Sequence, residues 1–168
     1  MTSLRPITHA DLAILEQMYT PAAGEFDWFG YRAGRSLRAR VEADETIDDR
    51  QGNLAVVDDA DMALGDVSWH RVDHAPPPNG WAWNIGIWLH PDSRGKGHGT
   101  AAQRALVDYL FAHTTIERIE ASTEIDNIAE QRALEKAGFT REGVMRHAVF
   151  RAGAYRDAVS YSILRNDR

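Results

Sequence analysis

The chain has 168 residues, a length that suits one domain with its own hydrophobic core. Hydrophobic residues make up 43% and charged residues 26%, a globular rather than a disordered composition. Cysteine is absent, which excludes a disulfide scaffold, a thiolate zinc site and a cysteine nucleophile. The net charge of -6 argues against nonspecific nucleic-acid binding and mildly favours a cationic or amine-bearing substrate. An acidic surface that maintains solubility is the more general explanation of that charge.

The chain shows no sign of a membrane or export segment. Its apolar runs fall short of the roughly 20 residues that cross a bilayer. Its first residues, Met1–Pro6, lack the basic-then-apolar layout of a signal peptide. We therefore expect a cytoplasmic protein without a membrane partner, organised as a single domain over residues 1–168.

The first third of the chain predicts a short strand and two helices. A strand over Leu4–Ile7 precedes a helix that Thr8 can cap and that Pro21 ends. The aromatic stretch Phe26–Tyr31 follows in irregular sequence and leads to a second helix over Ser36–Ile47. The aromatic side chains can cover a substrate site or anchor the segment to the core, and both interpretations stay open.

The clearest pattern in the chain is a strand with a period of two residues. Trp81, Trp83, Ile85, Ile87 and Leu89 alternate with smaller or polar residues until Pro91. The elements around it are predicted from turn residues and apolar spacing: a turn at Gly52-Asn53, strands over Leu54–Val57 and Ala63–Val72, a loop over Pro76–Gly80, a helix containing Leu106 and Leu110, a strand over Arg118–Thr123, a helix over Asn127–Ala137, and strands from Phe139 and over Tyr155–Leu164.

A glycine-rich turn between the alternating strand and the next helix has the composition of a phosphate site. It reads Asp92-Ser-Arg-Gly-Lys-Gly-His-Gly-Thr100. Glycines let the backbone approach a ligand, and the amides of a helix N-terminus attract phosphate oxygens. Arg94 and Lys96 add positive charge. The segment matches neither the Walker A pattern nor Gly-x-Gly-x-x-Gly, and a glycine-rich turn without a ligand is the alternative.

Two motifs carry a resemblance to a known family. Arg94-x-x-Gly97-x-Gly99, after an apolar strand and before a helix, resembles motif A of the GCN5-related N-acetyltransferases (GNAT). The run from Asn127 through Leu-Glu-Lys-Ala-Gly138-Phe139 is similar to motif B of the same family. The late segment Ala154–Leu164 is similar to the RimJ/RimL-like branch. The resemblance covers about residues 81–165.

The resemblance implies an α/β (α+β) GNAT fold in one domain. Such a fold has a mixed, mostly antiparallel twisted sheet of about seven strands, about four helices, and a V-shaped cleft for coenzyme A between the fourth and fifth strands. Backbone groups of the fourth strand then pair with the pantetheine arm, and the glycine-rich amides hold the pyrophosphate. The implied cofactor-binding residues are Ile87, Trp88, Leu89, Arg94, Gly95, Lys96, Gly97, His98, Gly99, Thr100 and Asn127.

The catalytic residues of the family do not carry over. Leu134 stands where many members have a Tyr that acts as the acid, and Asn84 corresponds to a Glu that often acts as the base. Glu130 stands where the RimJ/RimL branch often has a Ser; it is either a solvated helix residue, the interpretation we favour, or faces the thioester sulfur. Candidates for a catalytic base are Glu130, Tyr155, Glu124 and His70.

Three tryptophans and two histidines also need an interpretation. Trp81 and Trp83 share the apolar phase of their strand and are expected in the core, whereas Trp88, on the opposite phase, is expected to line the cleft. His70 and His74 are four residues apart, but their strand-to-loop setting does not favour a zinc pair, and we expect no metal.

The resemblance predicts an enzyme, an acyl-CoA-dependent N-acyltransferase that moves acetyl from acetyl-CoA to a primary amine. The acceptor is a protein N-terminus or a small-molecule amine, and neither nucleic acid nor a membrane is an expected partner. Formation of a homodimer stays open. A non-catalytic acyl-CoA-binding module is the alternative, since the usual Tyr and Glu are missing. A phosphate-binding domain for another nucleotide is the third hypothesis, which motif B disfavours.

Overall fold

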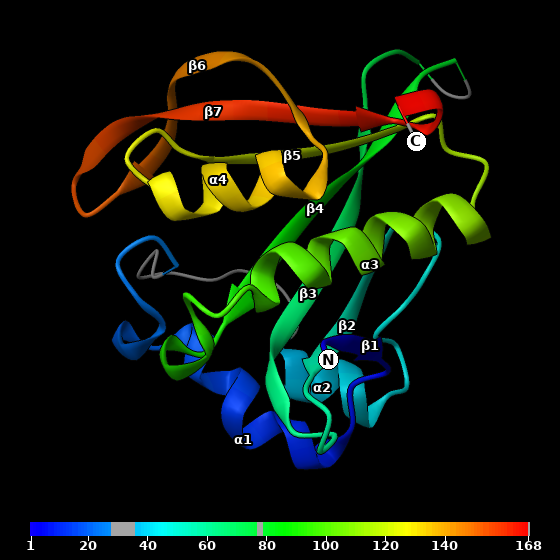
Figure 1. The fold of residues 1–168 in the computed structure, drawn as a ribbon, viewed down its shortest axis with the longest axis vertical. Helices are drawn as coiled ribbons and strands as arrows, with labels where there is room; N and C mark the ends of the chain where they lie inside the picture. Colours follow the sequence, from blue (N-terminus) through cyan, green and yellow to red (C-terminus); the bar gives the residue numbers. More distant parts are fainter. Residues whose placement is uncertain (28–35, 77–78, 168) are drawn as a thin grey trace.

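The computed structural model describes residues 1–27, 36–76 and 79–167, and in that part seven strands form one sheet (Figure 1). The strand order is β1-β2-β3-β4-β5-β7-β6. The strands are β1 Ser3–Arg5, β2 Gln51–Val57, β3 Ala63–Asp73, β4 Trp81–Leu89, β5 Arg118–Glu124, β6 Thr140–Arg151 and β7 Ala154–Leu164. The α-helices of the described part are α1 Leu12–Leu15, α2 Leu37–Glu42, α3 His98–His113 and α4 Ile128–Ala137.

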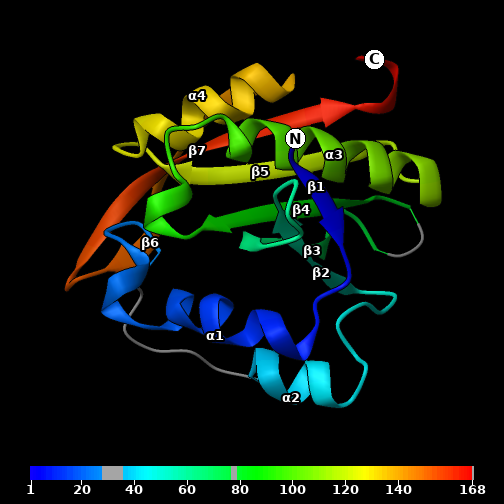
Figure 2. The same cartoon turned by 60° about the horizontal axis from the view of Figure 1, so that its bottom comes forward.

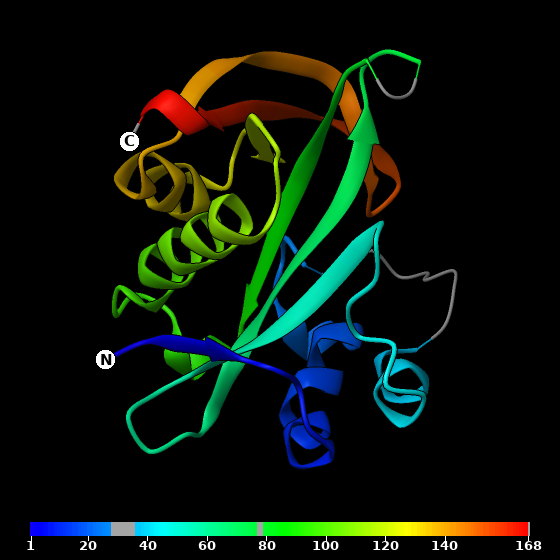
Figure 3. The ribbon, with the colours of Figure 1, turned by 90° about the vertical axis from the view of Figure 1, so that its right-hand side faces the viewer.

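The sheet opens between β4 and β5. These two strands form the parallel pair of an otherwise antiparallel sheet, and they pair only where Trp83–Ile85 lie beside Ile119–Ala121. Beyond that point β4 continues to Leu89 and β5 to Glu124 without pairing with each other, and the two strands diverge (Figure 1; Figure 3 views β5 nearly end-on). The predicted fold class and the V-shaped opening are confirmed.

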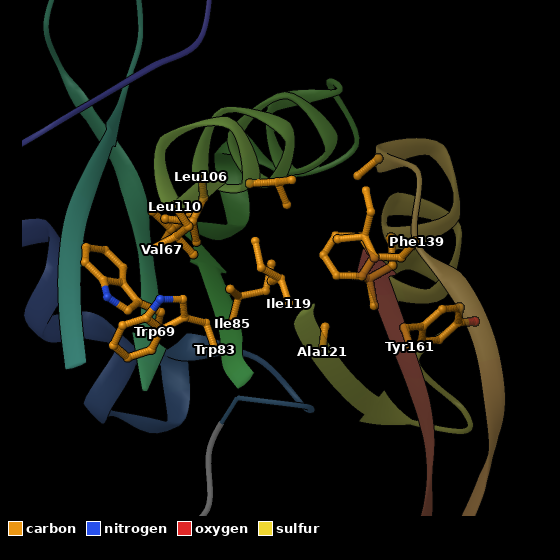
Figure 4. Packing of buried hydrophobic residues seen from close by; sticks show 14 of the residues in the cluster. Val67, Trp69, Trp83, Ile85, Leu106, Leu110, Ile119, Ala121, Phe139 and Tyr161 are labelled. Carbon is orange, nitrogen blue, oxygen red and sulfur yellow. The ribbon is translucent and has the colours of Figure 1, made fainter. Parts of the chain in front are cut away.

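Helices cover both faces of the sheet. α3 and α4 lie on one face, and α1 and α2 lie on the other (Figure 2). Under α3 and α4, the larger hydrophobic cluster joins Trp83 and Ile85 of β4 to Leu106 of α3 and Tyr161 of β7 (Figure 4). The alternation of β4 therefore places Trp83 in the core, as predicted, and Trp81 packs against the same cluster.

The indole of Trp88 belongs to the second, smaller cluster beneath α1 and α2. Its exposed fraction is 3%, and its Nε1 donates to the carbonyl oxygen of Ala23 at 3.3 Å. Trp88 contributes to the cleft wall, as predicted, but its ring packs on the opposite face of the sheet from α3.

The predicted turn at Gly52-Asn53 is wrong, since both residues lie in β2. The chain reverses earlier, where the Asp48 carboxylate accepts hydrogen bonds from the backbone N–H groups of Arg50 and Gln51. A β-carbon at Gly52 would lie 2.0 Å from the Trp69 ring. The glycine is thus required by a close approach across the sheet and not by a turn.

Both helices of the first third are shorter than predicted. The segment between Thr8 and Pro21 alternates between 3-10 turns and the single α-turn Leu12–Leu15, and it ends before Pro21 as expected. α2 begins after Ser36, whose hydroxyl accepts from the N–H of Ala39, and it ends at Glu42, shortly before Asp44 at φ 55°. A left-handed residue cannot continue an α-helix, which explains the early end.

Three of the aromatic residues in the Phe26–Tyr31 prediction, Trp28, Phe29 and Tyr31, lie outside the described residues. The predicted loop over Pro76–Gly80 connects β3 to β4, and residues 77–78 of it likewise lie outside them. Within the described ranges, no helix is long and apolar enough to cross a membrane.

A partly buried ion pair joins β1 to the turn before α1, and it predicts a dependence of stability on pH. Arg5 donates two hydrogen bonds to Asp11, at 2.7 and 2.9 Å, and Thr8 donates two more. Burial alone would raise the pKa of the Asp11 carboxyl, but the Arg5 and Thr8 hydrogen bonds outweigh it and hold the pKa below its usual value. A carboxyl group whose pKa is lower in the folded state stabilises the fold at pH values above its unfolded-state pKa of about 4. That stabilisation is lost as the pH falls through the folded-state pKa.

We expect Asp11→Asn to lower the free energy of unfolding at pH 7 by about 1.5–3 kcal/mol, the range for hydrogen bonds to a charged group. The difference from the wild type should shrink as the pH falls below about 4, because both proteins then lack the carboxylate. Urea denaturation at pH 7 and pH 3 measures both quantities. Asp49→Asn, at an exposed position, is the control and should match the wild type at both pH values. A constant difference between Asp11→Asn and the wild type across this range would contradict the expectation.

Candidate functional site

A cleft of about 740 Å³ lies where β4 and β5 diverge. Its walls come from the end of β4, the glycine-rich turn and first turns of α3, the end of β5, and the first half of α4. Every residue predicted to bind the cofactor lines this cleft except Lys96 and His98. The predicted residues that line the cleft are Ile87, Trp88, Leu89, Arg94, Gly95, Gly97, Gly99, Thr100 and Asn127.

The glycine-rich turn forms an open cradle at the N-terminus of α3. Gly95 and Gly97 have φ angles of 71° and 86°, and a β-carbon built at either would meet no atom within 4 Å. Gly97 is the N-cap residue, and its carbonyl oxygen accepts the first helical hydrogen bond from Ala101 at 3.1 Å. The free N–H groups of the first turn of α3 therefore lie at the positive end of the helix dipole, an arrangement that binds phosphate.

The side chains of Arg94, Lys96 and His98 in this turn form hydrogen bonds with other protein groups. Arg94 donates to the carbonyl oxygens of Leu89 and Ala23 and to the Asp27 carboxylate, the last at 3.1 Å. Lys96 donates to the carbonyl oxygen of Asp92 at 2.7 Å, and His98 is hydrogen-bonded to Thr2 at 2.8 Å. In this structure the cradle therefore consists of backbone amides, and Arg94 joins the turn to the segment before residue 28.

The opposite wall contributes backbone groups of β4. Ile87, Trp88 and Leu89 pair with β3 along one edge. Along the other edge the pairing with β5 ends at Ile85, so backbone groups of the Gly86–Leu89 stretch that point toward β5 border the cleft instead of a strand. An extended ligand arm with amide groups can pair with such an edge as an additional strand does.

The first turn of α4 closes the cleft. Asn127 is the N-cap residue of α4, and its side-chain oxygen accepts from the N–H of Glu130 at 3.3 Å. It also lines the cleft, so the capping role and the predicted contact with the cofactor are compatible. Leu134, further along α4, has no exposed surface and lies in the larger hydrophobic cluster. The interpretation of Leu134 as a structural residue fits this position.

Glu130 is not the solvated helix residue that the sequence favoured. It is half-buried in the cleft wall, where Gln103 of α3 donates to its Oε1 at 2.5 Å. Burial raises the pKa of the Glu130 carboxyl to about 7, the Gln103 hydrogen bond opposes this rise, and the nearby Asp27 carboxylate adds to it. Burial also raises the pKa of Asp27, against the effect of Arg94. Two carboxyl groups with raised pKa values thus face the same cleft.

Glu124 also lines the cleft, but an arginine neutralises it. Arg151 of β6 donates to both Glu124 carboxylate oxygens, at 2.6 and 2.8 Å, and both residues are buried. The Arg151 guanidinium also lies over the Phe26 ring, 5.3 Å from its centroid. The bidentate ion pair occupies both carboxylate oxygens of Glu124, which makes Glu124 a weaker candidate for a catalytic base than Glu130.

The other two candidates for a base lie away from the cleft, as does Asn84. His70 and Asn84 face each other across β3 and β4, before the point where β4 and β5 diverge. Tyr155 is 63% exposed at the start of β7 and packs against His147 and Phe150. None of the three lines the cleft.

The sequence analysis missed several residues that line the cleft. Gln103 follows Gly99 by four residues on α3, a spacing that places both on one helix face and could have identified it. Asp27 carries no comparable signal, because only folding brings it to Arg94. Others include Ser122 and Thr123 of β5 and Arg132, Ala133 and Lys136 of α4.

Comparison with known proteins identifies the family. An acetyltransferase (GNAT) domain matches residues 2–140. The probable N-acetyltransferase YjcK of Bacillus subtilis is 41% identical over 83 residues, 49% of this chain and 46% of that protein. The putative ribosomal N-acetyltransferase YdaF of the same organism is 32% identical over 103 residues, 61% of this chain and 54% of that protein. In both comparisons the chain thus spans about half the length of its relative.

The likeness to solved structures extends over almost the whole fold. Spermidine N-acetyltransferase from Vibrio cholerae, in complex with CoA and spermine, superposes with a TM-score of 0.79 at 20% identity over 99% of this chain and 96% of that one. The two proteins therefore share one fold, with helices on both faces of a sheet. The domain match spans most of the sequence, and the glycine-rich turn and the start of α4, which carry the two family motifs, both line the cleft. The chain belongs to the GNAT acetyltransferase family.

Proposed function

We propose that the protein is an N-acetyltransferase that moves an acetyl group from acetyl-CoA to a primary amine. The observation that carries the proposal is the amide cradle at Gly95 and Gly97, which opens into the cleft between β4 and β5. Coenzyme A combines a pyrophosphate with an extended arm that contains amide groups. The cleft offers a helix N-terminus for the first and an unpaired strand edge for the second.

The chain's own residues can promote such a transfer in two ways. Binding both reactants in one cleft supplies effective molarity, which alone lowers the barrier substantially for an activated thioester. Backbone N–H groups along the β4 edge can stabilise negative charge that develops on a carbonyl oxygen. A carboxyl group in the cleft can take up a proton. Among the described residues, Glu130 is the cleft carboxyl group that forms no ion pair with a cation.

The carboxyl groups of the cleft support an acceptor that carries positive charge, although Arg94, Arg132 and Lys136 line the cleft as well. Asp27 and Glu130 both line it, and the chain has a net charge of -6. The Vibrio cholerae neighbour was crystallised with spermine, a polyamine, whereas YdaF is described as a putative ribosomal acetyltransferase. We favour a small cationic amine over a protein N-terminus because of the two carboxyl groups.

Use of acetyl-CoA further supports a cytoplasmic location.

Release of free thiol from acetyl-CoA, measured with a panel of amines, tests the proposal. The panel contains diamines, polyamines, aminoglycosides and peptides with free N-termini, and a parallel series uses succinyl-CoA. We expect turnover with at least one small cationic amine. Tight binding of CoA without turnover on any amine would favour the non-catalytic acyl-CoA-binding module. Calorimetric binding of ATP with an affinity equal to that of CoA would contradict the assignment of the cleft.

A further inference from the structure

Glu130 is a carboxyl group in a cleft whose other carboxyl groups have cationic partners. Asp27 pairs with Arg94, and Glu124 pairs with Arg151. Arg132 and Lys136 line the cleft from α4, but neither forms an ion pair with Glu130 within the described ranges. The side-chain partner of Glu130 there is the neutral amide of Gln103.

Gln103 is an unusual partner because it is almost completely buried. Its exposed fraction is 1%, its Nε2 donates to Glu130, and its Oε1 has no hydrogen-bond partner in the described part of the chain. An arginine or lysine at this position would favour the ionised carboxylate strongly. An amide N–H can donate to an oxygen of the carboxylate and, more weakly, to the carbonyl oxygen of the protonated acid. Gln103 therefore holds the Glu130 side chain in one place in both protonation states.

The hydrogen bond also determines which oxygen exchanges the proton. Because Oε1 accepts from Gln103, the proton is gained and lost at Oε2. Burial and the Asp27 carboxylate raise the pKa of Glu130 to about 7, so both forms are populated near neutral pH. A group whose pKa lies near the working pH is well suited to accept a proton and pass it on.

We propose that Glu130 is the proton carrier of acetyl transfer and that Gln103 is the residue that positions it. The inference rests on the proposed function. The nitrogen of the neutral, unprotonated amine forms a bond to the acyl carbon, the carbon–sulfur bond breaks, and its electron pair leaves with the sulfur. The proton lost by the nitrogen goes to Oε2 of Glu130 and from there to the sulfur, which restores the carboxylate. One carboxylate can serve both atoms because nitrogen and sulfur flank the same carbon.

The active form at the start of each turnover is the carboxylate, so turnover rises as the pH rises through about 7, the pKa of Glu130. The charged groups around it are Asp27 with Arg94, the Glu124–Arg151 pair, and Arg132 and Lys136 on its own helix. Arg94 and Arg151 hold their carboxylate partners in ion pairs, and Gln103 is neutral. The pH dependence is therefore assigned to Glu130, with Asp27 as the group that raises its pKa.

Turnover against pH, measured for the wild type, Glu130→Gln, Gln103→Leu and Glu135→Gln, tests the inference. Glu130→Gln should lower kcat by about 10²-fold or more, the usual contribution of a general base, and should abolish the rise near neutral pH. The KM for acetyl-CoA should change less than about twofold, because the cradle at Gly95 and Gly97 is untouched. Gln103→Leu removes the hydrogen bond that opposes the raised pKa, so the rise should move to higher pH. Glu135→Gln makes the same change at an exposed position of α4 and should match the wild type.

Thermal melting of all four proteins shows whether each variant is folded, and a carboxyl carbon NMR titration reads the pKa of Glu130 without turnover. A folded Glu130→Gln variant that keeps the rise in turnover would overturn the assignment of the proton carrier and leave the proposed function intact. An unchanged Glu130 pKa in Gln103→Leu would overturn the positioning role. A wild-type protein that acetylates no amine would overturn both the inference and the proposed function.

Discussion

Gly97→Glu should abolish measurable binding of CoA. Gly97 lies at φ 86° with open space where its β-carbon would be, directly in the cradle. A glutamate there fills the space, repels the phosphates, and offers its own carboxylate to the amides at the N-terminus of α3. We expect the dissociation constant for CoA to rise at least about 100-fold, which corresponds to about 2.7 kcal/mol of binding free energy.

Gly153→Glu is the matched control. Gly153 also has a positive φ, 79°, with no atom within 4 Å of a built β-carbon, but it lies in the turn between β6 and β7 and not in the cleft. Both variants bear a similar backbone strain, so their melting temperatures should fall by similar amounts. Calorimetric titration should detect the loss of CoA binding only in Gly97→Glu. Equal CoA affinity in the two folded variants would refute the placement of the pyrophosphate.

Leu134→Ala should damage the fold and leave the chemistry almost unchanged. The side chain is fully buried in the cluster between α4, α3 and the sheet, and it does not line the cleft. Truncation of a buried leucine costs about 2–5 kcal/mol, because apolar surface is lost and a cavity remains. For a domain of this size the melting temperature should fall by roughly 4–20 °C. Turnover per folded molecule, measured well below the melting temperature, should stay within about twofold.

Two further variants sharpen this test. Ile128→Ala lies on the same helix at a position that is 49% exposed, and it should change the free energy of unfolding by less than about 0.5 kcal/mol. Leu134→Tyr introduces the acid that many family members have at this position. Because Leu134 faces the core, the larger side chain should destabilise the protein by about 1–3 kcal/mol and should not speed turnover. A faster Leu134→Tyr enzyme with normal stability would show that the position reaches the reacting atoms.

Local patterns in the sequence were sufficient to predict several elements of the fold and part of the site. The alternation of β4 identified its two faces, because a strand has a side-chain period of two wherever it folds. The glycines before α3 identified the phosphate cradle, because positive φ angles and a helix N-terminus are set within a few residues. The same argument failed at Gly52-Asn53, where the glycine serves a contact with Trp69 on another strand.

Which side chains meet in the cleft depends on contacts between segments that are far apart in the sequence. Arg94 bonds to Asp27 across 67 residues of chain, and Gln103 bonds to Glu130 across 27 residues. No local pattern encodes such contacts, because they depend on how α3 packs against α4 and on how the segment before residue 28 crosses the end of β4. Burial between these elements, and not residue type, raises the pKa of Glu130. The sequence offered Glu130 as one of several carboxylates, and packing made it the carboxyl group without a cationic partner among the described residues of the cleft wall.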